Sequence, residues 1–253
     1  MSIQLLPSNF DEAITAAVKI FWANRSAGSG SQGGSRSNVI GGKNLDGFIS
    51  VVKLVAEHCG IPQECVISTG RTLLTIPGYF RPTKTWDVLV VYRQRLVAAF
   101  EFKSQVGSFG NNFNNRTEEV LGNATDFWAA HSKGAYLPTN YAVVRESAID
   151  PRPPFLGYLM LLQDCSKSVA PVSAYSAHYD IFPVFERSSY ADRYRILCER
   201  LMEENLYSAA AVIMSDQERG QSEGEYRQLS EATSVHSLFR EFAGRAAAAS
   251  FSD

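Results

Sequence analysis

The chain has 253 residues, 45% of them hydrophobic, which is enough for a sizeable core and one large domain spanning residues 1–253. Its 24 basic and 26 acidic residues nearly balance, which excludes a uniformly basic nucleic-acid-binding protein, so any basic surface is local. With no signal peptide, no membrane-length apolar segment and no C-x-x-C pair among its four cysteines, we expect a reduced, cytoplasmic chain without a zinc site or membrane contact.

Apolar residues recur at helical spacing over residues 9–24 and again over 45–58, which predicts two amphipathic helices. Between them, residues 26–37 are rich in glycine and serine and have no apolar anchor, so we expect a flexible loop. A phosphate-binding loop requires the pattern G-x-x-x-x-G-K-[ST]. This segment does not contain that pattern, so a loop of this kind is excluded. Ordering of this loop on a ligand remains an alternative.

The rest of the chain alternates between β-rich and helical patterns. We expect strands at residues 86–92, 96–103, 141–144, 155–162 and 209–214. We expect a polar loop at 104–115 and helices at 116–131, 190–205 and 235–249. This alternation predicts an α/β fold, with a mixed central β-sheet flanked by helices.

The two central strands predict a hairpin that brings two carboxylates together. If Arg93 to Arg95 form the turn, Asp87 lies directly across from Glu101, with Cβ atoms about 5 Å apart. Lys103 lies two residues beyond Glu101 and therefore projects from the same face. A bulge near the turn would shift this register by one residue.

Such a carboxylate pair among apolar neighbours needs a compensating charge. Oxygen ligands without His or Cys indicate Mg²⁺ or Mn²⁺ rather than Zn²⁺, with Asp87, Glu101 and the carbonyl of Phe102 as ligands. Lys103 would hold or deprotonate an attacking water and offset charge on a phosphorane. The alternative is a salt-bridged cross-strand trio at the end of a sheet. Residues 71–116 hold seven basic and two acidic residues, which indicates either a scatter of solvated surface charges or a local basic surface around the two acids.

These residues also resemble a known family. The D-x(13)-E-x-K arrangement resembles the PD-(D/E)xK nuclease core, with Trp86 in place of the superfamily's proline. Residues 78–87 (GYFRPTKTWD), 101–119 (EFKSQVGSFGNNFNNRTEE) and Gly41-Gly42-Lys43 with Asp46 resemble the XhoI-type restriction endonuclease family, most strongly over 78–131.

The resemblance implies a homodimeric type II restriction endonuclease. Its substrate would be palindromic double-stranded DNA of the CTCGAG kind, each subunit cutting one strand to leave a 5′-phosphate, with Mg²⁺ as cofactor. A cognate DNA methyltransferase would protect the host DNA. The alternatives are another PD-(D/E)xK nuclease, acting in repair or on DNA structures, and a DNA-binding protein that has lost catalysis.

Nucleases of this kind often add an acidic residue from a helix packed on the sheet. Asp46 and Glu57 are the candidates, and Asp46 is the one we include among the catalytic residues. Its alternative role is favourable placement near the N-terminus of the helix. Glu57, close to the helix end, is expected on the surface.

Candidate DNA contacts come from both sides of the hairpin. Asn and Gln can pair with adenine, and Arg with guanine, whereas cations also hold phosphates. The candidates are Arg81, Lys84, Gln105, Asn111, Asn112, Asn114 and Arg116. Asn115, in an N-x-x-E pattern, is the expected helix cap. The aromatic residues are expected in the core rather than in a base-stacking platform.

Overall fold

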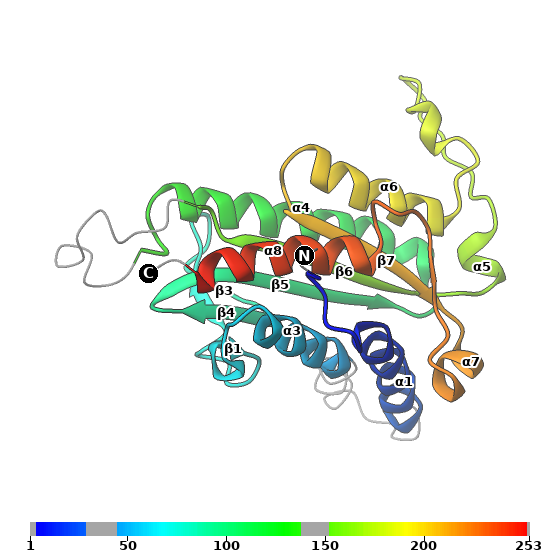
Figure 1. The fold of residues 1–253 in the computed structure, drawn as a ribbon. Helices are drawn as coiled ribbons and strands as arrows, with labels where there is room; N and C mark the ends of the chain where they lie inside the picture. Colours follow the sequence, from blue (N-terminus) through cyan, green and yellow to red (C-terminus); the bar gives the residue numbers. More distant parts are fainter. Residues whose placement is uncertain (1–3, 29–44, 138–151, 252–253) are drawn as a thin grey trace.

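The computed structural model describes residues 4–28, 45–137 and 152–251 (Figure 1). A six-stranded sheet with the order β1-β4-β5-β6-β7-β8 forms its centre. The strands are β1 (Val66–Ile67), β4 (Val88–Tyr92), β5 (Arg95–Gln105), β6 (Phe155–Gln163), β7 (Ala209–Ser215) and β8 (Arg227–Gln228). Strands β5, β6 and β7 run parallel and the outer pairs antiparallel, so the predicted mixed α/β sheet is confirmed.

Helices cover both faces of the sheet (Figure 1). The helices α1 (Phe10–Gly28), α3 (Asp46–His58) and α8 (Val235–Ser250) share one hydrophobic core with the sheet. The helices α4 (Phe109–Ser132) and α6 (Tyr190–Glu203) share a second core on the other face. Short elements are α5 (Ser166–Val169), α7 (Gln217–Ser222), the 3-10 helices Gln63–Cys65 and Pro183–Phe185, and a separate hairpin of β2 (Thr75–Pro77) and β3 (Thr83–Thr85).

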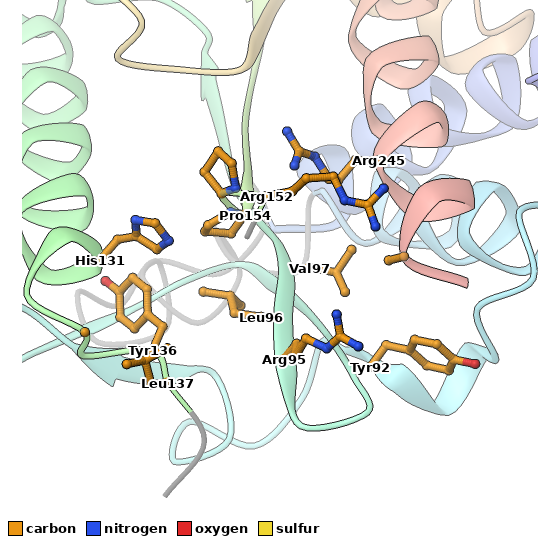
Figure 2. A pocket seen from close by; sticks show the side chains of 13 residues that line it. Tyr92, Arg95, Leu96, Val97, His131, Tyr136, Leu137, Arg152, Pro154 and Arg245 are labelled. Carbon is orange, nitrogen blue, oxygen red and sulfur yellow. The ribbon is translucent and has the colours of Figure 1, made fainter. Parts of the chain in front are cut away.

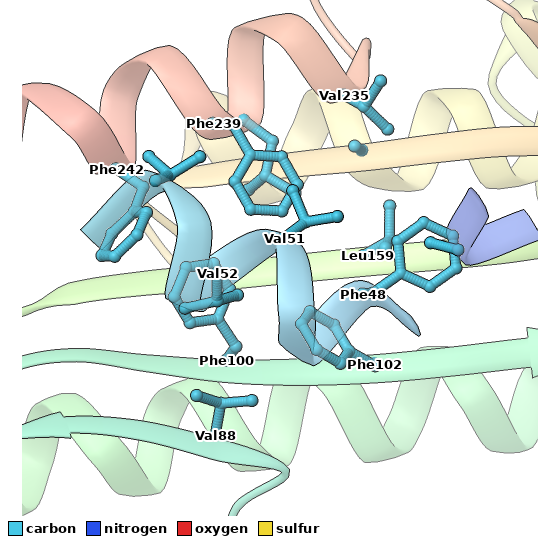
Figure 3. Close-up of a cluster of buried hydrophobic side chains, with 14 of the residues drawn as sticks. Phe48, Val51, Val52, Val88, Phe100, Phe102, Leu159, Val235, Phe239 and Phe242 are labelled. Atoms are coloured by element: carbon cyan, nitrogen blue, oxygen red, sulfur yellow. The ribbon is translucent and has the colours of Figure 1, made fainter. Parts of the chain in front are cut away.

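The packing of β5 against the first core determines where its polar side chains lie. Phe100 and Phe102 face α3 and α8 (Figure 3), with ring centroids 5.0 Å between Phe100 and Phe242 and 6.4 Å between Phe102 and Phe48. Because successive side chains of a strand point to opposite faces, the residues between and after these phenylalanines face α4.

Most expected elements are present. The predicted helices at 9–24, 45–58, 190–205 and 235–249 correspond to α1, α3, α6 and α8. The predicted strands at 155–162 and 209–214 correspond to β6 and β7, whose continuous apolar runs are buried on both faces, as parallel strands require. The predicted strand at 141–144 lies outside the described residues.

The predicted polar loop at 104–115 is wrong. Strand β5 continues to Gln105 and helix α4 already begins at Phe109, with Ser108 rather than Asn115 in the N-cap position. The asparagines of this segment therefore lie on the first turns of a helix. Residues 26–28 of the loop expected at 26–37 instead belong to α1, and residues 29–37 lie outside the described residues.

The hairpin between β4 and β5 differs from the prediction in two ways that cancel. The turn has two residues, Arg93 and Gln94, both with positive φ, so Tyr92 pairs with Arg95. A β-bulge then leaves Val97 unpaired and returns the ladder to the expected register, with Val88 opposite Phe100. Extending that register by one residue brings Asp87 beside Glu101.

None of the helices in the described ranges is both long and apolar enough to cross a membrane.

Candidate active site

Asp87, Glu101 and Lys103 gather under helix α4. Glu101 and Lys103 lie on β5, and Asp87 immediately precedes β4. Both β5 residues bond to side chains of α4, on the face opposite α3. The crossover from β5 through α4 to the parallel strand β6 lays this helix over the cluster.

The Glu101 carboxylate is the centre of this cluster and is only 1% exposed. Asn123 Nδ2 lies 2.8 Å from each of its oxygens, Lys103 Nζ lies 2.7 Å from Oε1, and the Tyr207 hydroxyl donates to Oε2 at 3.3 Å. Lys84 Nζ is 3.7 Å from Oε1. A buried carboxylate is tolerated only with such compensation, so these contacts hold the Glu101 side chain in place.

Asp87 is fixed against the backbone of β5. Its Oδ2 accepts a hydrogen bond of 2.7 Å from the Phe102 N–H. The N–H and C=O of one strand residue point to the same edge, so the Phe102 carbonyl faces the Asp87 side, beyond the start of β4. Burial raises the pKa of Asp87, a change that Lys103 and the Phe102 N–H oppose and that Glu101 reinforces.

Lys103 bridges two acidic residues. Its Nζ is 2.7 Å from Glu101 and 3.1 Å from Glu119 of α4. Burial by itself would lower the pKa of Lys103, but Glu101 and Asp87 outweigh burial and raise that pKa. The ammonium form is therefore favoured, which suits Lys103 to donating a hydrogen bond and offsetting negative charge rather than to removing a proton.

A second set of contacts orients Asn123. Arg81 donates to Asn123 Oδ1 at 2.7 Å and to Asp126 Oδ2 at 2.8 Å, and Asp126 Oδ1 also accepts the backbone N–H groups of Tyr79 (2.8 Å) and Phe80 (2.7 Å). Burial would raise the pKa of Asp126, but these donors outweigh burial and lower the pKa. The loop between β2 and β3 is thus tied to α4, and Asn123 can turn only its amide N–H₂ toward Glu101.

Gly78 allows that loop to approach the helix. A Cβ on this residue would lie 2.6 Å from Asp126 Oδ2 and 2.6 Å from the Arg81 carbonyl oxygen. Neither neighbour can retreat without breaking the contacts that orient Asn123, so a side chain at this position would move the loop away from the cluster.

Lys84 is the predicted DNA-binding cation that lies closest to the cluster. Besides its approach to Glu101, its Nζ bonds to the Thr85 carbonyl at 2.9 Å and lies 4.7 Å from the centroid of the Trp86 ring. A cation held over an aromatic face beside a buried carboxylate is placed in advance of any ligand. Arg81, the other predicted phosphate contact before β4, is engaged with α4.

Asp46 is not brought into these contacts. It begins α3, whose side chains pack in the core on the opposite face from Glu101, and it is exposed. Two residues later, Phe48 packs against Phe102, so the start of α3 still lies near the backbone of β5. Glu57 lies at the other end of α3 and accepts a hydrogen bond from Gln63 at 2.6 Å, as expected of a surface residue.

The predicted DNA contacts from the end of β5 onward divide into two groups. Gln105 does not fit a role in reading bases, because it is buried, its amide donates to the Ser108 carbonyl at 3.2 Å, and its carbonyl accepts from the Tyr194 hydroxyl. Asn111 and Asn114 are exposed on the first turns of α4, Asn112 is half-buried, and Arg116 pairs with Glu119 at 2.6 Å. These four stay predictions.

Several residues of the cluster were missed by sequence reasoning. They are Asn123, Glu119, Asp126 and Tyr207. Three of them are three or four residues apart within the helix, a polar stripe on the face that packs over the sheet. That spacing was a usable signal, whereas nothing in the sequence near Tyr207 connects it to Glu101.

The donor set limits which ion this place could hold. No group of three or more His, Cys, Asp and Glu residues with metal-binding geometry occurs within residues 4–28, 45–137 and 152–251. The residues present are instead two carboxylates and one backbone carbonyl, all oxygen donors. Mg²⁺ characteristically takes one or two carboxylates and keeps several waters, so the set fits Mg²⁺ and not Zn²⁺.

A separate pocket lies where β5 and β6 begin (Figure 2). Arg95, Arg152 and Arg245 line it together with His131, Tyr92 and Leu96. The lining of this pocket does not include Glu101 or Lys103, which lie further along β5.

Comparison with known proteins gives consistent matches. The family model described as restriction endonuclease XhoI matches residues 23–228. The type II restriction enzyme XhoI of Xanthomonas vasicola is 44% identical over 202 residues, covering 77% of this chain and 76% of that enzyme. The type II restriction enzymes BstVI of Geobacillus stearothermophilus and AbrI of Azospirillum brasilense are each 42% identical, over 76% and 71% of this chain and 82% and 77% of their own lengths. No solved structure matches.

Proposed function

The chain belongs to the XhoI family of type II restriction endonucleases, and from that premise we propose that Asp87, Glu101 and Lys103 are its active site. The observation that carries this assignment is the convergence of the three side chains beneath α4, with Glu101 bonded to Lys103 and Asp87 bonded to the backbone between them. A site-specific deoxyribonuclease needs such charges at the scissile phosphate.

The surrounding elements support a PD-(D/E)xK core. An antiparallel hairpin carries Asp87 just before one strand and Glu101 and Lys103 on the other, followed by helix α4 and a parallel strand. This order places the three residues where the hairpin opens, so a DNA backbone could approach them from the edge that β4 leaves uncovered.

Mg²⁺ would be held by Asp87, Glu101 and the Phe102 carbonyl. When bound, the ion supplies Lewis-acid stabilisation of the phosphate and lowers the pKa of a coordinated water. Lys103 would orient the attacking water and offset the charge that develops on the phosphate. Asn123 would keep the Glu101 carboxylate turned toward the ligand site, and Asp46 stays a proposed accessory acid from α3.

The substrate would be palindromic double-stranded DNA of the CTCGAG kind, cut in both strands by a homodimer to leave 5′-phosphates. Lys84 would contact the backbone near the cut, and Arg81 would contribute positive charge at the same edge. Asn111, Asn112, Asn114 and Arg116 would reach the DNA from the start of α4. The enzyme would work in the cytoplasm, where a cognate methyltransferase protects the host DNA.

Digestion of phage DNA tests this function. With Mg²⁺ we expect discrete bands, ends that ligate without prior phosphorylation, and cut sites that map to one palindrome. The same DNA incubated with EDTA, or after treatment with a methyltransferase for that palindrome, should remain intact. A smear would indicate a non-specific nuclease, and bound but uncut DNA would remove the enzymatic proposal.

A further inference from the structure

One segment of the chain leaves the body and returns to the same point. Residues 173–187, which we call the aromatic arm, lie between α5 and α6 and project beyond the rest of the molecule (Figure 1). Its neck is closed by a hydrogen bond of 3.0 Å from the Val172 N–H to the Ser188 carbonyl. Arg193 ties the same two residues together, donating to the Val172 carbonyl and to Ser188 Oγ, each at 3.0 Å. The arm is therefore a defined projection with a fixed base.

The arm exposes large apolar side chains. Tyr175 is 85% exposed, Tyr179 is 84% exposed and Phe182 is 68% exposed, and Val184 is exposed as well. Arg200 of α6 lies beside two rings of the arm, with its guanidinium 5.2 Å from the centroid of Phe182 and 4.9 Å from that of Phe185. Our expectation that the aromatic residues belong to the core is wrong here. Exposed aromatic groups on a projecting segment mark a surface that another macromolecule covers.

The charge of the arm argues against DNA as that macromolecule. Its fifteen residues contain Asp180 and Glu186 but only one cation, Arg187. Binding to the phosphate backbone depends on neutralising phosphates with Lys and Arg, which this segment does not provide. A surface that is rich in aromatic residues and poor in charged residues is instead characteristic of the centre of a protein–protein interface.

The cleavage reaction proposed above indicates which protein covers the arm. One chain carries one cluster of Asp87, Glu101 and Lys103, yet a type II enzyme cuts two antiparallel strands, so two chains must be held in a fixed relation. A buried Tyr or Phe removes about 150–250 Å² from water, so three such rings would cover roughly 450–750 Å² per partner. That is more than half of the ~800 Å² per partner in a standard interface.

We propose that the aromatic arm, residues 173–187, is the contact through which two copies of this chain pair. The proposal rests on the proposed function for the identity of the partner. A two-fold pair uses the same surface on both copies, so each arm both donates and receives aromatic side chains.

Sedimentation equilibrium of the purified protein without DNA or metal tests the pairing. The variant carries Tyr175→Ser and Tyr179→Ser, the two most exposed aromatic residues of the arm, neither of which takes part in the hydrogen bonds of the neck. The matched control is Phe251→Ser, an 84% exposed aromatic residue at the end of α8. We expect a dimeric wild type, a dimer dissociation constant at least tenfold higher in the double variant, and no change in the control. A monomeric wild type, or an unchanged dissociation constant in the double variant, would overturn the proposal.

Two further measurements, of plasmid cleavage and of DNA binding, separate this inference from the proposed function. On a plasmid with one cognate site, the double variant should accumulate nicked circles where the wild type gives linear DNA. If the double variant stays dimeric but loses affinity for a duplex in EDTA, the arm contacts DNA and the proposal fails. If the arm mediates pairing but no DNA is cut, the inference stands and the assigned active site falls.

Discussion

Asn123 should be essential because it holds a buried carboxylate in position. Asn123→Asp keeps the size of the side chain and can still accept the hydrogen bond from Arg81. It replaces the N–H₂ group, 2.8 Å from both oxygens of Glu101, with a second carboxylate. The substitution thus removes the donor and adds repulsion at a site that water barely reaches.

The size of the effect follows from the type of bond. A hydrogen bond to a charged group contributes about 1.5–3 kcal/mol. For a chain of this size, each kcal/mol lowers Tm by roughly 2–4 °C, so the loss of the bond alone lowers Tm by about 3–12 °C. Cleavage should fall by about a hundredfold, since a carboxylate misplaced by about 1 Å costs that much in rate.

Differential scanning calorimetry without divalent ions measures the first effect, and single-turnover cleavage of a cognate duplex measures the second. Asn115→Asp is the control, because Asn115 is exposed on the same helix. A Tm for Asn123→Asp within one degree of that control would refute the reasoning that Asn123 anchors Glu101.

Three other outcomes are expected. The folded protein raises the pKa of Asp87, so the folded state binds a proton there more readily than the unfolded chain does. Ionised Asp87 therefore lowers the stability of the fold at neutral pH, and this penalty is lost as the pH falls through the folded pKa. Asp87→Asn should raise the metal-free Tm at pH 8 but not at low pH. Lys84→Met should slow cleavage by about tenfold or more, equivalent to roughly 1.4 kcal/mol in the transition state. The control Lys133→Met, at the end of α4, should cut at the normal rate. Equal cleavage rates for the two variants would remove Lys84 from the site. Gln105→Leu should cost about 1–3 kcal/mol in urea unfolding without changing the recognised sequence, and a changed sequence would restore Gln105 to base reading.

The central hairpin was predictable for reasons that were only partly correct. Two apolar runs on either side of a polar triplet correctly indicated where the chain turns back. The turn type was missed because Arg93 and Gln94 adopt positive φ without the glycine or asparagine that usually signals it. The bulge at Val97 was not predicted, because no residue pattern in this part of the sequence indicates it. Asp87 met Glu101 because the two errors compensated.

Helix α4 shows where local patterns fail. Its first turns carry asparagines in place of an apolar stripe, so the segment resembled a loop. The face of this helix over the cluster carries Asn123 and Asp126, because its neighbours there are charged groups rather than a hydrophobic core. The contact between Asn123 and Glu101, 22 residues apart, is set by the tertiary crossover and could not be derived from spacing alone.

The buried strands were the easiest elements to predict. In β6 and β7 every residue except Gln163 is buried, and their uninterrupted apolar runs bounded by polar turns identify them directly. The short strands β1 and β8 were missed, because two residues are too few to show an alternation of apolar and polar side chains.

Cleavage by Glu101→Gln is the most direct test of the account. The variant keeps the shape of the side chain but removes the charge that Lys103 and Asn123 hold. We predict wild-type affinity for a cognate duplex, measured by fluorescence anisotropy in EDTA, and no detectable cutting of that duplex in Mg²⁺. Cutting at the wild-type rate, with the variant confirmed by mass, would contradict the assignment of Asp87, Glu101 and Lys103 as the active site.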